Sequence, residues 1–222
     1  MENIVKIISF KYLNHNVKQF RLEKPAGYSF TPGQATELAI NQTAWRDKKN
    51  PFSFTGLNDD PYLEFTIKIY PESTEGVTKK LSGLSIGDEL ILGDPWGVIA
   101  YKGPGYFIAG GSGITPFIAI LRQLDKESKL AGNKLFFSNK TDKDVFLAGE
   151  LKRMLGQDAL FLVSGQEDSC FDKRRIDEPF LRAEVNDFKR HFYICGPDPM
   201  MVQMNRILKD AGASPDAVIF ER

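Results

Sequence analysis

The chain has 222 residues, of which 42% are hydrophobic and 26% charged, and its 29 basic residues balance its 29 acidic ones. This length allows one large domain or two small ones, each with its own hydrophobic core. The balanced charge argues against nucleic acid or an anionic membrane as the main partner, and no apolar run approaches the roughly 20 residues of a transmembrane helix.

The first part of the chain carries short β-rich runs separated by Gly, Pro, Asn or Asp. The N-terminal stretch MENIVKIISFKYLNHNVKQF alternates apolar and polar residues like a strand, and it lacks the apolar core of a signal peptide. Such a series predicts a small antiparallel barrel. The runs cover residues 4–10, 17–22, 35–40, 51–56, 62–70 and 88–93.

Beyond Gly103 the pattern changes to strands that alternate with amphipathic helices. This alternation predicts a parallel sheet of five strands flanked by helices. The break Gly103-Pro104-Gly105 marks the linker between the two parts. The expected strands cover residues 105–110, 134–139, 159–165, 191–196 and 217–220, and the expected helices cover 114–127, 146–155, 178–184 and 199–212.

A glycine-rich turn, GGSG at residues 110–113, joins the first of these strands to a helix with Pro116 in its first turn. Such a turn exposes backbone N–H groups and a helix dipole at the carboxyl edge of the sheet, where anionic ligands bind. A tight connection without a ligand explains one glycine cluster equally well. Cys195, Gly196 and Pro197 form a second strand-to-helix turn, which we expect beside the first, so the pair predicts a shared pocket.

Seven short motifs occur in an order that resembles the ferredoxin-NADP reductase superfamily, which includes flavodoxin reductases and cytochrome b5 reductases. The resemblance covers nearly the whole chain. It implies a Greek-key antiparallel β-barrel that binds flavin, residues 1–102, followed by an α/β domain that binds NAD(P), residues 103–222. The motifs are FTPGQ (30–34), NPFSF (50–54), GVTKKLSGLSIGD (76–88), GDPWG (93–97), GGSGITPF (110–117), CGPDPM (195–200) and the terminal IFER (219–222).

The resemblance implies that the segment Asn50, Pro51, Phe52 and Ser53 holds the ring system of FAD. Phe52 lies against the isoalloxazine, although a strand aromatic is also a common core residue. Ser53 hydrogen-bonds near the flavin N5 atom and is one of three expected catalytic residues.

Asn50 stands where the family has an arginine that pairs with the flavin phosphate. An asparagine donates a hydrogen bond but supplies neither a charge nor a bidentate fork. The flavin is therefore expected to bind more weakly, or else Arg46, Lys48 or Lys49 supplies the missing charge.

The resemblance also implies that Gly76, Val77 and Thr78 bind the flavin pyrophosphate at the start of a short helix. Thr78 is equally explained as a helix cap. Trp96 either stacks on the adenine or covers the end of the barrel, and the second role is favoured. The ribityl and adenosine side is expected to be lined by Lys68, Ile69 and Tyr70.

On the nucleotide side, the resemblance places Cys195 near the nicotinamide C4 atom and Glu221 near the site of hydride transfer, which makes these two the other expected catalytic residues. Cys195 need not be a nucleophile, because no partner histidine is identifiable. The residues expected around the pyrophosphate and nicotinamide are Gly111, Ser112, Gly113, Ile114, Thr115, Gly196 and Pro197.

The loop after the strand at 159–165 is expected to decide between NADPH and NADH. Ser164 and the basic residues Lys173, Arg174 and Arg175 favour NADPH, because they offer partners for its 2′-phosphate. Gly165 stands where several NADPH-using relatives carry arginine, and basic loop residues are commonly just solvated. Ser164 and Arg174 are the expected nucleotide ligands of this loop.

The resemblance implies an NAD(P)H-dependent flavoprotein reductase that passes electrons through FAD to a separate acceptor protein, such as ferredoxin, flavodoxin or an oxygenase component. Only two cysteines occur, Cys170 and Cys195, too few for an iron–sulfur cluster in this chain and typical of a reducing, cytoplasmic protein. Two alternatives remain open. One is a reductase of free flavin, and the other is a non-catalytic, reductase-like regulatory subunit that binds flavin weakly.

Overall fold

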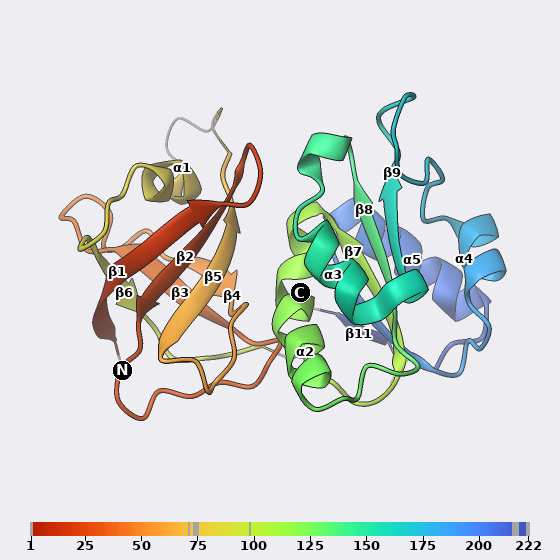
Figure 1. Cartoon of the computed structure of the whole chain (residues 1–222), viewed down its shortest axis with the longest axis horizontal. Coiled ribbons are helices and arrows are strands. Elements are labelled where there is room, and N and C mark those ends of the chain that lie inside the picture. The colour runs from red at the N-terminus through yellow and green to blue at the C-terminus, as the bar shows by residue number, and fades with distance from the viewer. Residues whose placement is uncertain (1, 71, 73–75, 98, 215–217, 221–222) are drawn as a thin grey trace. The chain divides into compact units, whose positions relative to one another are not determined.

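The computed structural model describes residues 2–70, 72, 76–97, 99–214 and 218–220. The chain divides into two units, which are drawn in Figure 1 and described separately below. The first unit comprises Met1–Gly97 and Thr115–Arg122, and the second comprises Val98–Ile114 and Gln123–Arg222. Among the described residues, no helix is both long enough and apolar enough to cross a membrane.

The first unit contains the predicted antiparallel barrel of six strands, in the order β4-β3-β6-β1-β2-β5. A bridge between Phe54 and Phe65 brings the end of β4 to β5 and so closes the ring of strands. The helix α1 (Val77–Ser82) follows β5 along the chain. The strands are β1 (Asn3–Tyr12), β2 (Val17–Glu23), β3 (Ala35–Ile40), β4 (Asn50–Ser53), β5 (Tyr62–Lys68) and β6 (Glu89–Leu92).

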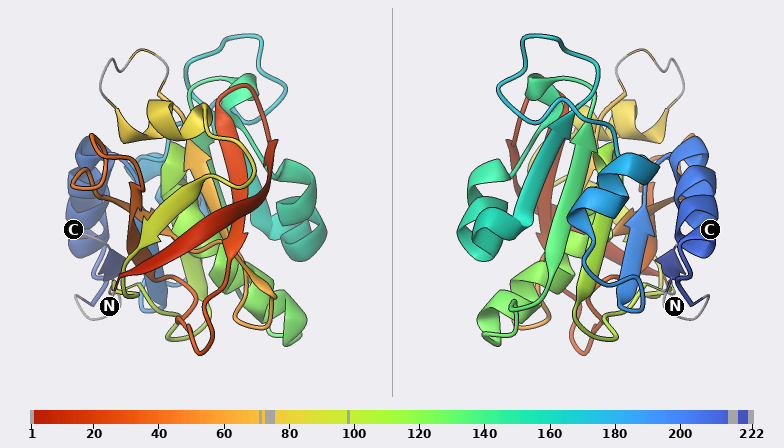
Figure 2. Two further views of the ribbon diagram at one scale, coloured as in Figure 1. Left: turned by 90° about the vertical axis from the view of Figure 1, so that its left-hand side faces the viewer. Right: turned by 90° about the vertical axis from the view of Figure 1, so that its right-hand side faces the viewer.

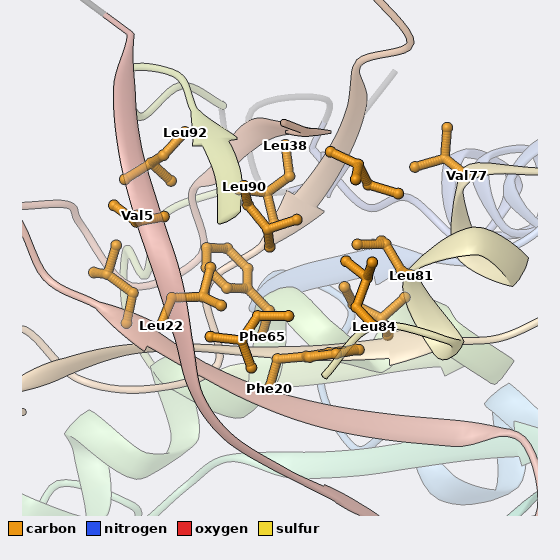
Figure 3. Packing of buried hydrophobic residues seen from close by; sticks show 14 of the residues in the cluster. Val5, Phe20, Leu22, Leu38, Phe65, Val77, Leu81, Leu84, Leu90 and Leu92 are labelled. Carbon is orange, nitrogen blue, oxygen red and sulfur yellow. The ribbon is translucent and has the colours of Figure 1, made fainter. Parts of the chain in front are cut away.

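Alternate residues of the barrel strands form its core, because successive side chains of a strand point to opposite faces. Phe20 and Leu22 of β2 and Phe65 of β5 are buried in one cluster, into which Leu81 of α1 also packs (Figure 3). The short helix therefore covers part of the barrel core.

The second unit contains a parallel sheet of five strands in the order β11-β10-β7-β8-β9, as predicted. Its central strands are almost wholly apolar, which is typical of parallel strands covered on both faces. The strands are β7 (Gly105–Gly110), β8 (Lys134–Asn139), β9 (Ala159–Val163), β10 (His191–Cys195) and β11 (Val218–Phe220).

Helices of the second unit cover both faces of this sheet (Figure 2). On one face, Phe180 of α4 (Glu178–Glu184) and Ile207 of α5 (Asp198–Asp210) share a buried cluster with Ile108 and Phe136 of the sheet. On the other face, Phe137 of β8 packs edge-on against Phe146, just before α3 (Ala148–Leu155). The helix α2 (Thr115–Lys126) follows β7 through a 3₁₀ turn, and its residues Thr115–Arg122 belong to the first unit.

Candidate cofactor-binding sites

The strand β4 holds the segment expected to contact the flavin ring. In the ladder with β3, Ser53 pairs with Ala35 and Phe52 pairs with Thr36, so Ser53 and Phe52 point to opposite faces of the barrel wall. Phe52 packs, partly buried, against the barrel core. Ser53 is half-buried on the outer face, and its hydroxyl makes no hydrogen bond within the described part of the chain. A hydroxyl in this position is available to a ligand.

Two of the three cations expected to compensate for Asn50 already have partners. The Lys49 ammonium lies 2.5 Å from the Glu2 carboxylate. The Lys48 ammonium lies 4.5 Å from the centre of the Trp45 ring. The site around Asn50 therefore contains less available positive charge than the sequence suggests.

The segment expected to bind the flavin pyrophosphate lies where α1 begins. Gly76 caps this helix through its backbone, and no side chain caps the first turn. Val77 is buried in the barrel core, so only its backbone is available to a ligand, whereas Thr78 is partly exposed.

The residues expected on the ribityl and adenosine side differ in exposure. Lys68 ends β5, Ile69 is buried in the core and Tyr70 is exposed. Of the three side chains, Ile69 therefore cannot contact a ligand without leaving the core.

A buried lysine holds the carboxyl end of α1, which the sequence did not predict. The Lys18 ammonium donates to the Ser82 carbonyl at 2.9 Å and lies 3.6 Å from the centre of the Phe10 ring. Burial lowers the pKa of Lys18. In the sequence Lys18 falls in the same alternating register as Phe20 and Leu22, which indicates an inward position, but no local signal indicates the partner of its ammonium group.

The two strand-to-helix turns of the second unit lie side by side, as predicted. Cys195 of β10 pairs with Ala109 of β7, which places the following residues of both strands at the same edge. A Cβ atom added to Gly113 would lie 2.2 Å from the Cys195 carbonyl oxygen, so glycine is required for this close approach.

The residues of the glycine-rich turn differ in what they offer a ligand. Gly111 has a φ of +55°, and open space surrounds the position where a Cβ atom would lie. Ile114 is buried, which leaves only its backbone available, and Thr115 begins α2. Pro197 caps α5 without a side-chain hydrogen bond to its first turn. Ser112 and Gly196 lie in the same pair of turns.

The loop after β9 places Ser164 and Arg174 differently. The Ser164 N–H donates to the Asn139 carbonyl, so Ser164 lies at the carboxyl edge beside β8. The Arg174 guanidinium donates to Asp172 at 2.6 Å and to Glu184 at 2.9 Å. These hydrogen bonds raise the pKa of Arg174 and lower the pKa of Asp172. Glu184 also pairs with Lys134 at the amino end of β8, so Arg174 belongs to a chain of ion pairs.

A buried amide at the carboxyl edge was missed in the sequence. Asn139, the last residue of β8, is 6% exposed, and neither atom of its amide group has a hydrogen-bond partner in the described part of the chain. Burial of an unpaired amide costs free energy, so such a group commonly awaits a ligand or a water molecule. The polar residues Ser138 and Asn139 at the carboxyl end of β8 were the available signal.

Cys195 lies at the end of β10, partly exposed. Glu221 lies outside the residues that the structure describes. Within the described ranges, no group of His, Cys, Asp or Glu side chains could hold a metal ion.

Comparison with known protein families supports the nucleotide site. Residues 107–206 match the model of the oxidoreductase NAD-binding domain family. This range begins in β7 and ends in α5, so it contains both glycine turns, Asn139 and the loop after β9.

Among curated proteins, the chain is 27% identical over 216 residues to the reductase component of propane 2-monooxygenase from Rhodococcus jostii, covering 90% of this chain and 57% of that protein. It is 28% identical to NADH–cytochrome b5 reductase 1 from Arabidopsis thaliana, covering 95% of this chain and 80% of that protein. The chain thus spans less than two thirds of the monooxygenase reductase.

Among solved structures, the fold matches a ferredoxin NADP⁺ reductase from Neisseria gonorrhoeae with bound FAD and NADP. The TM-score is 0.85 and the identity 17%, covering 99% of this chain and 98% of that one. The cytochrome b5 reductase-type domains of human Ncb5or match with a TM-score of 0.86 and 24% identity, covering 100% of this chain and 70% of that one. Both comparisons establish the arrangement of the elements.

Proposed function

We propose that the chain is an NAD(P)H-dependent flavoprotein reductase of the ferredoxin-NADP reductase-like superfamily, which passes electrons through FAD to a separate acceptor protein; the match to the NAD-binding domain family and the likeness to curated reductases support this proposal. The observation that carries the proposal is the pair of adjacent glycine turns at the carboxyl edge of a parallel sheet, inside the matched NAD-binding range. The relatives suggest an acceptor such as an oxygenase component or cytochrome b5, and ferredoxin or flavodoxin fit the same chemistry.

The barrel residues fit a flavin. Ser53 presents an unpartnered hydroxyl on the outer face, which suits a hydrogen bond to a ring nitrogen. Asn50 and the backbone N–H groups at Gly76, Val77 and Thr78 would hold the phosphates. FAD, when bound, accepts a hydride and releases its two electrons one at a time.

The residues of the second unit fit a nicotinamide nucleotide. The open space at Gly111 admits a pyrophosphate. The unpaired side-chain amide of Asn139 offers an NH2 donor and a carbonyl acceptor to a ribose or an adenine. Cys195 would shape the nicotinamide pocket. The protein's contribution is to bind and orient two planar rings, since hydride transfer requires the reacting atoms within roughly 3 to 3.5 Å of each other.

An absorption spectrum tests the proposal directly. Purified protein reconstituted with FAD is expected to absorb near the visible flavin maxima and to bleach on anaerobic addition of NADH or NADPH. Protein that takes up flavin but is not bleached by either nucleotide contradicts the reductase. Protein that takes up no flavin at all supports the regulatory alternative.

Reduction of free flavin is the second candidate, and the surroundings of Asn50 favour it. With Lys49 paired to Glu2 and Lys48 over Trp45, Arg46 alone of the three expected cations is left for the flavin phosphate. A micromolar flavin dissociation constant, together with rapid release of reduced flavin, would identify this activity. Retention of FAD through gel filtration would instead favour the protein-bound cofactor.

Replacing Ser53 by alanine is expected to slow flavin reduction by about tenfold while FAD remains bound, because one hydrogen bond near N5 is lost and the fold is not disturbed. Stopped-flow reduction at saturating nucleotide measures the rate, and a flavin titration measures the binding. Ser53→Thr keeps the hydroxyl and is the matched control. A reduction rate that is equal in Ser53→Ala and wild type removes this role.

NADH is expected to be used at least about tenfold more efficiently than NADPH. The 2′-phosphate of NADPH carries up to two negative charges and needs a cation, but of the three basic loop residues Arg174 is held by Asp172 and Glu184 and Lys173 donates to the Glu167 carbonyl, which leaves Arg175. The ratio of kcat/KM for the two nucleotides measures the preference. Arg174→Gln should leave that ratio unchanged, whereas a specific loss of NADPH use in this variant would show that Arg174 does bind the phosphate.

A further inference from the structure

The barrel carries a large exposed aromatic residue, Trp96, just beyond the end of β6. Its side chain is 41% exposed. Burial of an indole is favourable because it removes apolar surface from water. An exposed indole forgoes this stabilisation, so its position on the barrel calls for an explanation.

A β-bulge determines where Trp96 points. The Gly93 N–H still donates to the Glu37 carbonyl, in register with the β3–β6 ladder. Ala35 and Trp96 then exchange both of their backbone hydrogen bonds, each 2.8 Å long. Two residues, Asp94 and Pro95, therefore lie opposite Thr36 alone. One extra residue in a strand turns the following side chain to the opposite face.

Two hydroxyl groups stabilise this bulge from the barrel side. The Thr36 hydroxyl donates to the Gly93 carbonyl at 2.9 Å, and the Tyr28 hydroxyl donates to the same oxygen at 2.8 Å. Thr36 is buried, and the Tyr28 ring packs against the barrel core. Buried groups thus hold the bulge in place, so it is a defined part of the barrel and not the irregular start of a loop.

The bulge places Trp96 on the same face as Ser53. Ala35 pairs with Ser53 on one side and with Trp96 on the other, and directly opposed residues of antiparallel strands project from the same face. Strands are spaced about 4.8 Å apart, so Ser53 and Trp96 stand roughly 10 Å apart across the small side chain of Ala35. Phe52 projects from the opposite face, toward the core.

We infer that Trp96 is a flavin-binding residue whose indole lies against the isoalloxazine ring held by Ser53. The inference rests on the proposed function. The row Ser53-Ala35-Trp96 provides a hydroxyl and an aromatic surface on the two sides of a buried alanine, across a span comparable to a tricyclic ring. If the adenine stacked on the same indole, the adenine end of FAD would lie beside Ser53. The N5 atom of the isoalloxazine would then have no hydroxyl partner.

Titrations with riboflavin, FMN and FAD test the inference. Trp96→Leu is expected to raise the dissociation constants of all three flavins by roughly tenfold or more, which is typical for the loss of one aromatic stacking contact. Trp96→Phe should recover most of the affinity. An indole on the isoalloxazine also adds a long-wavelength charge-transfer band to the flavin spectrum, and this band should disappear in Trp96→Leu. The apparent melting temperature without flavin should change little, because Trp96 is exposed.

The matched control is Trp45→Leu, since the Trp45 indole packs against the barrel core. This variant should lose stability but bind riboflavin as wild type does. Equal riboflavin affinity in Trp96→Leu and wild type overturns the inference, and so does a loss confined to FAD, which would place the indole on the adenine. If Trp96→Leu does not fold, an unchanged charge-transfer band in Trp96→Phe overturns it equally, because a phenyl ring is a weaker electron donor than an indole. Wild-type protein that binds no flavin overturns the proposed function itself.

Discussion

Replacing Glu64 by glutamine is expected to lower the free energy of unfolding by about 3 kcal/mol, which is typical when one partner of a buried ion pair is removed. Glu64 is 3% exposed on the outer face of β5. Its Oε1 atom accepts from Arg122 at 2.6 Å, from Gln19 at 3.0 Å and from Thr55 at 3.1 Å. A glutamine in its place removes the negative charge that pairs with Arg122. Its NH2 group would also face side chains that are themselves hydrogen-bond donors.

Urea unfolding followed by far-ultraviolet circular dichroism, which reports on both units, measures this change. The matched control is Glu178→Gln, because Glu178 pairs with Arg182 at 2.7 Å one helical turn away and both side chains are at least half exposed. That pair should contribute no more than about 0.5 kcal/mol. If both variants lose the same small amount of stability, Glu64 is not the centre of a network and the buried contacts contribute little.

Arg122→Gln and the double variant complete a thermodynamic cycle. Arg122 donates to the Thr55 carbonyl at 2.7 Å as well as to Glu64, so its removal takes one donor from each acceptor, although Glu64 keeps its hydrogen bonds from Gln19 and Thr55. Because the residues touch, the double variant should be less destabilised than the sum of the two single variants. Strict additivity would mean that the two side chains act independently.

The barrel and the parallel sheet could be predicted from the sequence, because their signals are local. Phe20 and Leu22 alternate with polar residues along β2, and the apolar run of β7 ends in glycines. The placement of both glycine turns at one edge also followed, since all strands of a parallel sheet end at the same edge, whereas the neighbouring positions of β7 and β10 depend on the strand order of the sheet. Local patterns suffice wherever burial and turn chemistry decide the structure.

The pairing of charges could not be predicted, because it depends on residues far apart in the chain. Glu64 reads as an exposed position of an alternating strand, yet Arg122, 58 residues away, covers it. Arg174 reads as a free cation for a phosphate, but Asp172 and Glu184 hold it. A sequence shows which charges are present and not which are already neutralised. The bulge before Trp96 is hidden for a similar reason, since it exists only relative to the neighbouring strand.

Replacing Gly113 by alanine is expected to disrupt the second unit and abolish nucleotide binding. The new Cβ atom would lie 2.2 Å from the Cys195 carbonyl oxygen and 2.7 Å from the Gly196 nitrogen. These are backbone atoms of a central strand, so they cannot rotate aside as a side chain does. The turn must separate from β10, at a cost of at least about 3 kcal/mol, the upper end of ordinary overpacking.

Two other glycines separate this steric effect from the general effect of adding a methyl group. Gly149→Ala adds a Cβ atom in open space on α3, where alanine should stabilise the helix by about 0.5 kcal/mol or more. Gly111→Ala also meets open space, but its φ of +55° costs about 1 kcal/mol. The melting temperature and the affinity for NADH should therefore be higher in Gly149→Ala than in Gly111→Ala. Both should be far higher in these two variants than in Gly113→Ala. A folded Gly113→Ala protein that binds NADH like wild type would show that the two turns do not need to touch, and the shared nucleotide pocket would lose its structural basis.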